Sequence, residues 1–154
     1  MNELARILVV SGDTSILRAT SRILKSAGYR IIEAATGEEG LRAAQEQAPD
    51  LVLLDVALSD LDGVEVCRRI KAAPVTARAF VVLLSNVKTD SESQANGIEA
   101  GADGYITRPV SDRELLARVQ ALLRIKSVED ALRASEDKFK YVFDYSIIGK
   151  SITL

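Results

Sequence analysis

The sequence predicts an α/β protein in which helices cover both faces of a five-stranded parallel sheet. Short apolar runs rich in Val, Ile and Leu alternate with longer amphipathic stretches, which is typical of βα units joined by right-handed crossovers. The runs are continuously apolar, as in strands buried on both faces. The five expected strands are Ile7–Val10, Arg30–Ala34, Leu51–Leu54, Phe80–Leu84 and Gly104–Thr107.

Each of these runs is followed by a segment with the apolar spacing of a helix. Capping-box spacing marks two helix starts, at Thr36 with Glu39 and at Ser111 with Glu114. The glycines placed to end helices in the left-handed conformation are Gly28 and Gly101. In chain order the apolar helix positions are Ile16, Leu17, Ile23 and Leu24; Gly40, Leu41 and Ala44; Val64, Val66, Cys67 and Ile70; Ile98 and Ala100; and Leu115, Leu116, Val119, Leu122 and Leu123.

The composition excludes several kinds of chemistry. The 154 residues include no histidine and one cysteine, Cys67, which removes His-containing triads, His-rich zinc sites and an internal disulfide. Lys and Arg total 20 against 22 Asp and Glu, a net charge of −2, so we expect no nucleic-acid binding. No apolar run approaches the ~20 residues of a membrane span, and the N-terminus is unlike a secretory signal, which favours the cytoplasm.

Three polar residues stand where predicted strands end. Asp55 follows the most apolar run, Ser85 follows the fourth run and Arg108 follows the fifth. Sites in open parallel sheets form at the carboxyl ends of the strands, so these side chains are expected to meet. A nucleophilic carboxylate, a hydroxyl and a cation outline a phosphoryl site. A helix cap or turn is the alternative role for Asp55, and strand termination is the alternative for Ser85.

Residues 4–124 resemble the receiver domains of two-component response regulators. The motifs that carry the resemblance are ILVV from Ile7, LVLLDVALSDLDG around Asp55, VVLLS ending at Ser85 and GADGYITRP with Tyr105 and Arg108. The resemblance implies a flavodoxin-like fold with strand order 2-1-3-4-5 and no enzymatic activity in the receiver. It also implies that Asp55 accepts a phosphoryl group from the phosphohistidine of a histidine kinase or phosphotransfer protein. Ser85 and Tyr105 then become the hydroxyl and aromatic switch residues.

The chain departs from the family's pattern around the expected metal ion. The family holds Mg²⁺ with an acidic pair directly after the first strand, where this chain has Ser11 and Gly12. The candidate ligands that remain are Asp13, Asp55 and the backbone carbonyl of Ala57, which gives a weak Mg²⁺ site or none.

A second departure concerns the cation after the fifth strand. Arg108 replaces the family's Lys, which pairs with the phosphoryl group; it keeps the charge but presents a planar fork. Without the acidic pair, Arg108 can form a permanent ion pair with Asp55.

Among the other acids, Asp60 and Asp62 are expected to serve the turn and the helix start. Cys67 is expected to be a small core residue, and strand packing is the alternative role for Tyr105.

Beyond Leu123 the helical pattern continues into a predicted linker, 125–138. A heptad stripe over 121–143 predicts a parallel coiled-coil dimer, with one locally packed amphipathic helix as the alternative. The stretch from Ser135 to the end resembles the opening of a PAS domain, with the pattern SE..F..VF..S..G, and 139–154 are predicted to be a fragment of that domain. Residues 151–154 would begin its first strand but have no partner strands, so they are expected to be frayed or held by dimer contacts. The stripe consists of Ala121, Ile125, Val128, Leu132, Ser135, Phe139 and Val142.

Three functional hypotheses follow. The first is a phosphorelay receiver, over 1–124, that passes a conformational signal through the linker to a PAS or output module such as a histidine kinase or diguanylate cyclase. The second is a degenerate receiver that works as an interaction and dimerisation module without phosphorylation. A homodimer through the fourth and fifth helices or through 121–143 fits either of them. The third, a flavodoxin-like enzyme or nucleotide binder, lacks any P-loop or G-x-G-x-x-G pattern.

Overall fold

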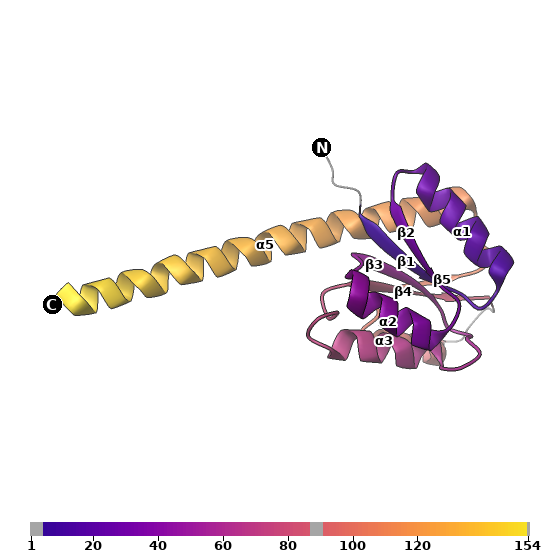
Figure 1. Cartoon of the computed structure of the whole chain (residues 1–154), viewed down its shortest axis with the longest axis horizontal. Helices are drawn as coiled ribbons and strands as arrows, with labels where there is room; N and C mark the ends of the chain where they lie inside the picture. Colours follow the sequence, from indigo (N-terminus) through magenta and orange to yellow (C-terminus); the bar gives the residue numbers. More distant parts are fainter. Residues whose placement is uncertain (1–4, 87–90, 154) are drawn as a thin grey trace. The chain divides into compact units, whose positions relative to one another are not determined.

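The computed structural model describes residues 5–86 and 91–153, with side chains described up to 137 except at 91–93. The chain forms two compact units, residues 1–119 and 120–154, which are treated separately below. Figure 1 labels the elements except α4. In chain order they are β1 (Arg6–Val10), α1 (Thr14–Ser26), β2 (Arg30–Ala34), α2 (Gly37–Gln47), β3 (Leu51–Asp55), α3 (Gly63–Ala72), β4 (Phe80–Ser85), α4 (Ser91–Glu99), β5 (Gly104–Thr107) and α5 (Asp112–Thr153).

The five strands form one parallel sheet with the order β2-β1-β3-β4-β5, which confirms the predicted topology. Three strands are one residue longer than predicted, because Arg6, Asp55 and Ser85 also pair within the sheet. The edge strands are β2, which carries the exposed Arg30 and Glu33, and the four-residue β5.

Helices cover both faces of this sheet, and each face has its own apolar layer. Figure 1 shows α1 on one side of the strands and α2 and α3 on the other. The layer beneath α2 and α3 includes Leu8, Val52, Leu54 and Leu83, all fully buried. Each such Leu side chain contributes about 1.5–3 kcal/mol through burial.

Cys67 lies in the same apolar layer, as the sequence predicts. Its side chain is buried, and its Sγ lies 3.8 Å from the carbonyl oxygen of Ala100. Burial raises the pKa of the Cys67 thiol to about 11. A raised pKa keeps the thiol protonated near neutral pH, which together with its burial favours a packing role for Cys67.

The predicted helix starts are formed by the expected side chains. The backbone N–H of Glu39 donates to Thr36 Oγ1 at 3.1 Å, and that of Glu114 donates to Ser111 Oγ at 3.0 Å. The Glu39 carboxylate accepts from the N–H of Ala35, one residue before the cap, at 2.8 Å.

Among the described residues, left-handed backbone appears at both predicted glycines and at one further position. Gly28 has φ 99° and Gly101 has φ 102°, as their places after helices predict. The C-cap of α2, Ala48, is also left-handed with φ 48°, and its N–H donates to the carbonyl of Ala44 at 3.2 Å. An alanine gives no sequence signal for this conformation.

The chain from Asp112 to Thr153 is a single helix, α5, so the predicted receiver–linker boundary at 124 falls inside it. Residues 151–153, which the sequence predicts to be frayed for lack of partner strands, continue the helix instead. Leu154 lies outside the described residues. A lone strand has no neighbour for its backbone groups, whereas a helix satisfies them internally. No helix in the described ranges is long and apolar enough to cross a membrane.

Candidate functional site

The predicted site residues gather at the carboxyl ends of β3, β4 and β5. Asp55 is the last residue of β3 and Ser85 the last of β4, and both are buried. Arg108 follows β5, and its backbone N–H donates to the Ser85 carbonyl at 2.6 Å. Because parallel strands end at the same edge, three residues separated by 53 positions in the chain form one cluster.

An ion pair between Arg108 and Asp55 is the centre of this cluster. Arg108 Nη1 donates to Asp55 Oδ1 at 3.0 Å, and the same nitrogen donates to Asn86 Oδ1 at 3.0 Å. The Asp55 side chain is 8% exposed and that of Arg108 17%. The Arg108–Pro109 peptide is cis. The sequence places Asn86, directly after Ser85, at the same sheet edge as the candidate site, but it assigns this residue no chemical role.

The ion pair compensates a carboxylate that the fold has removed from water. Burying an isolated charge is costly, and a guanidinium with direct hydrogen bonds is an effective partner for it. Asp55 and Arg108 together carry no net charge. The sequence left two roles open for Arg108, pairing with a phosphoryl group or forming an ion pair with Asp55. This structure has the ion pair.

The residues after β1 form hydrogen bonds with one another and with the first turn of α1. Ser11 is buried, and its Oγ accepts from the Asp13 N–H at 3.2 Å. Asp13 is the N-cap of α1, and its Oδ1 accepts from the Ile16 N–H at 3.1 Å. One oxygen of the predicted metal ligand Asp13 therefore serves as a helix cap.

These residues do not fit the Mg²⁺ site that the receiver resemblance implies. Mg²⁺ takes near-octahedral oxygen coordination with one or two carboxylates. Asp55 is bonded to Arg108, Asp13 is exposed and caps α1, and Ala57 is exposed in the loop after β3. Among the side chains that the structure describes, no three Asp, Glu, Cys or His residues group in a way that could hold a metal ion.

Tyr105, the predicted aromatic switch, lies on β5 opposite Leu83 of β4. It is half-buried against the apolar layer under α2 and α3. A Cβ at Gly97 of α4 would come within 3.2 Å of the Tyr105 ring, so the ring packs directly on that helix. The structure thus gives Tyr105 the strand-packing contacts of its alternative role.

Two acids in the loop after β3 cap two different helices. Asp62 Oδ1 accepts from the Val64 N–H at 2.9 Å and starts α3, as predicted. Asp60 instead reaches α2: Oδ1 accepts from the Gly37 N–H at 2.8 Å and Oδ2 from the Glu38 N–H at 3.0 Å. Because Gly37 is 23 residues away in the chain, local spacing gives no sign of this tie.

The hydrogen bonds from α2 to Asp60 predict that the stability difference between the wild type and Asp60→Asn depends on pH. Hydrogen bonds from backbone N–H groups, that of Glu38 foremost, lower the pKa of Asp60 below its ordinary value of 3.8. A lowered pKa in the folded state stabilises the protein above pH 3.8, and this contribution is lost as the pH falls below it. Urea unfolding of the wild type and Asp60→Asn should therefore show a clear gap at pH 7 that narrows towards pH 3.

The control for this prediction is Glu46→Gln, on the exposed face of α2. It should unfold like the wild type at every pH. A gap between Asp60→Asn and the wild type that stays constant from pH 7 to pH 3 would contradict a role for the ionised carboxylate.

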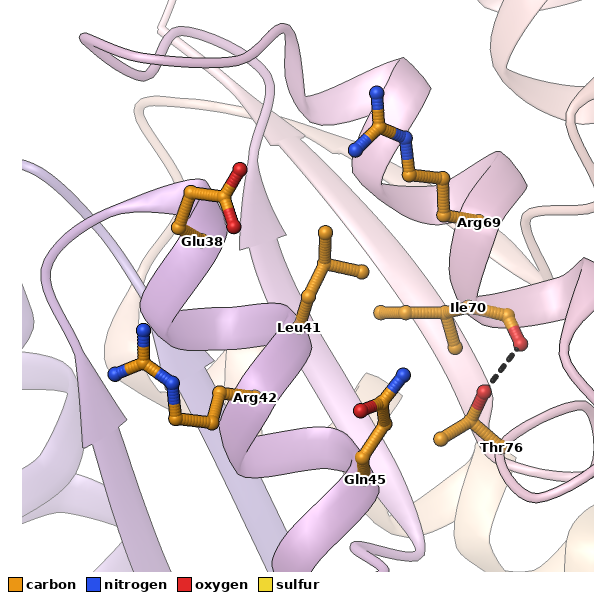
Figure 2. A pocket seen from close by; sticks show the side chains of 7 residues that line it. All are labelled: Glu38, Leu41, Arg42, Gln45, Arg69, Ile70 and Thr76. Atoms are coloured by element: carbon orange, nitrogen blue, oxygen red, sulfur yellow. Dashed lines mark hydrogen bonds between the residues drawn. The ribbon is translucent and has the colours of Figure 1, made fainter.

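A separate groove of about 350 Å³ lies between α2 and α3. Figure 2 shows Leu41 and Ile70 pointing towards each other across it, with Arg42 and Arg69 at its rim. Thr76 Oγ1 donates to the Ile70 carbonyl at 2.6 Å. None of its lining residues comes from the strand ends that carry Asp55, Ser85 and Arg108, so it is no part of the candidate site.

The fold and the site together define a CheY-like flavodoxin fold with a carboxylate at the end of its central strand. The sequence model of the response regulator receiver domain matches residues 7–120. The chain therefore belongs to the response regulator receiver family.

Relatives and solved structures agree with this assignment. The alkaline phosphatase synthesis transcriptional regulatory protein PhoP of Bacillus subtilis is 38% identical over 144 residues, 94% of this chain and 58% of PhoP. The transcriptional regulatory protein AfsQ1 of Streptomyces coelicolor is 42% identical over 118 residues, 77% of this chain and 51% of AfsQ1. The chain thus spans little more than half the length of these relatives.

Among solved structures, a CheY-like receiver domain protein from Methanospirillum hungatei JF-1 has a TM-score of 0.78 at 32% identity. The match covers 82% of this chain and 99% of that protein. PhoP and AfsQ1 are named as transcriptional regulatory proteins, so these comparisons do not support the expected absence of nucleic-acid binding. That expectation rests on the net charge of −2 and stays a prediction.

Proposed function

We propose that this chain is the receiver module of a cytoplasmic two-component signalling protein whose site is held in one state by the Asp55–Arg108 ion pair. In this proposal its contacts with a histidine kinase, a second copy or a PAS output module do not need phosphorylation of Asp55. The 3.0 Å ion pair at a buried carboxylate, beside Ser11 and Gly12, is the observation that carries the proposal.

The charge balance explains why this arrangement favours a fixed state. The resemblance implies a site in which an acidic pair and the acceptor Asp are balanced by Mg²⁺ and a Lys. Here one carboxylate is balanced by one guanidinium, so the site is neutral without a metal. Phosphorylation of Asp55 would replace one negative charge by about two. With no divalent cation, the added charge would lie uncompensated in a largely buried place.

The test measures intact mass after treatment with acetyl phosphate, with and without Mg²⁺. The wild type should gain no adduct of about 80 Da, the mass of one phosphoryl group. A restored variant carrying Ser11→Asp, Gly12→Asp and Arg108→Lys should gain it only with Mg²⁺, because the missing charges are returned. Adding Asp55→Asn to that variant should abolish the adduct.

Circular dichroism and urea unfolding establish that each of these variants is folded. A Mg²⁺-dependent adduct on the wild type that Asp55→Asn removes would overturn the fixed-state proposal. A folded restored variant that stays unmodified would contradict the charge explanation.

The second candidate is phosphoryl acceptance on Asp55 in a phosphorelay. The approach of Asp55, Ser85 and Arg108 at one edge of the sheet favours it, because a guanidinium fork suits phosphoryl oxygens. In this case the phosphohistidine of a kinase or phosphotransfer protein is the donor, and the signal passes through α5 to the PAS or output module. The mass measurement on the wild type separates the two candidates.

A further inference from the structure

An exposed apolar stripe runs along the second unit, residues 120–154, on α5. Ile125 is 50% exposed, Val128 68% and Leu132 57%. Their spacing of three and four residues places them on one side of the helix. In a soluble chain such large apolar side chains usually stay exposed singly, so three in a continuous row indicate an interaction surface.

The ion pairs of this part of α5 lie away from the stripe. Lys126 Nζ is 2.8 Å from Asp130 Oδ2, and Arg133 Nη1 is 3.7 Å from Asp130 Oδ1. With Ile125 and Leu132 at heptad position a and Val128 at d, these three charged residues fall at b and f, on the opposite face. The exposed stripe is therefore separate from these ion pairs, one member of which, Lys126, is buried.

We propose that this stripe pairs with the same stripe of a second copy of the chain in a parallel, in-register coiled coil. The observation that selects this occupant is charge complementarity beside the stripe. Arg124 stands at heptad position g and Glu129 at the following e, the two positions that face each other between parallel helices. Neither side chain has an ion pair among the residues described in the structure.

The same charges disfavour the antiparallel arrangement. In a parallel pair, Arg124 of each chain meets Glu129 of the other, which gives two opposite-charge contacts. An antiparallel pair centred on Val128 would instead bring the two Glu129 side chains close together, and like charges repel. The inference identifies a second copy of the chain as the partner of the stripe. Only the signalling role of such a dimer rests on the proposed function. The inference itself depends on α5 alone, so it succeeds or fails independently of the mass measurement.

The first test is sedimentation of the full chain over a range of concentrations. The wild type should shift from 16.7 kDa towards twice that mass, with a roughly micromolar dissociation constant. Val128→Glu and Leu132→Glu place a charge in the stripe and should each weaken dimerisation at least tenfold. The control, Val75→Glu, changes an equally exposed apolar residue of the first unit, 73% exposed, and should dimerise like the wild type.

The second test determines the orientation. Arg124→Glu and Glu129→Arg should each weaken the dimer about five- to tenfold, and the double exchange should recover it to within about threefold. Ser135→Cys, one heptad beyond Val128, should form a disulfide-linked dimer on mild oxidation, because a parallel pair brings residues 135 together. The buried thiol of Cys67 serves as the internal unreactive control.

Either of two results would overturn the inference. One is a mass of 16.7 kDa at every concentration up to about 0.5 mM. The other is a dimer that Val128→Glu and Leu132→Glu leave unchanged, which would place the interface elsewhere. A dimer that the charge exchange does not recover, and that Ser135→Cys does not link, would contradict the parallel orientation.

Discussion

Gly63→Ala is expected to lower the free energy of unfolding by about 3 kcal/mol, as overpacking against rigid neighbours does. A Cβ at this position would lie 2.2 Å from the backbone oxygen of Asp55 and 2.7 Å from Cα of Val56. Both are backbone atoms, so no side-chain rotation relieves the clash. The Gly63 N–H also donates to the Val56 carbonyl at 2.8 Å, which holds the start of α3 against the end of β3.

Urea denaturation measures this effect, with Gly12→Ala as the matched control. The atom nearest to a Cβ at Gly12 is the backbone oxygen of Ala35, 3.8 Å away, an ordinary contact. Gly12→Ala should therefore stay within about 0.5 kcal/mol of the wild type. Equal unfolding midpoints for the two variants would show that the end of β3 can move away from α3.

Arg108→Ala is expected to cost about 2–3 kcal/mol, because it leaves the buried carboxylate of Asp55 without its cation. We place the value below the range for fully buried pairs, since Arg108 itself is 17% exposed and water can enter after truncation. Asp55→Asn should cost less than about 1 kcal/mol, because an amide needs no counter-charge and still accepts a hydrogen bond.

A double-mutant cycle tests whether the two residues act as a pair. In an Asp55→Asn background, Arg108→Ala should cost less than about 1 kcal/mol, which leaves a coupling energy above about 1 kcal/mol. Additive costs would mean that Arg108 stabilises the protein through its aliphatic stem or through Asn86. In that case the ion pair would not be the feature that holds the site.

The fold could be predicted from the sequence because its strands and helix ends have clear local signals. Continuous apolar runs such as Leu51–Leu54 occur where both faces of a sheet are covered, and Gly28 and Gly101 mark helix ends by their chemistry. The strand ends were less predictable: Asp55 and Ser85 extend their strands, because backbone pairing continues past the last apolar side chain. Residues 151–153 were expected to be frayed, because the resemblance to part of a PAS domain leaves the start of a strand without partners, but the chain is helical there.

The site was predictable to the extent that it lies at strand ends. Asp55, Ser85 and Arg108 were predicted to meet, and the structure brings them to one edge of the sheet. Contacts that depend on three-dimensional packing were not predicted. The Asp60 tie to α2 spans 23 residues, and the approach of Gly63 to the end of β3 depends on the path of the intervening loop.

The edges of the sheet limit the ways in which this module can bind other proteins. β2 carries the exposed charges of Arg30 and Glu33, and β5 has four residues followed closely by Pro109, which has no N–H to donate. Charged, short and proline-flanked edges resist pairing with a further strand. Partners that extend a sheet with their own backbone are therefore disfavoured. Recognition falls to side chains on helices and loops, whose identity can change without altering the sheet.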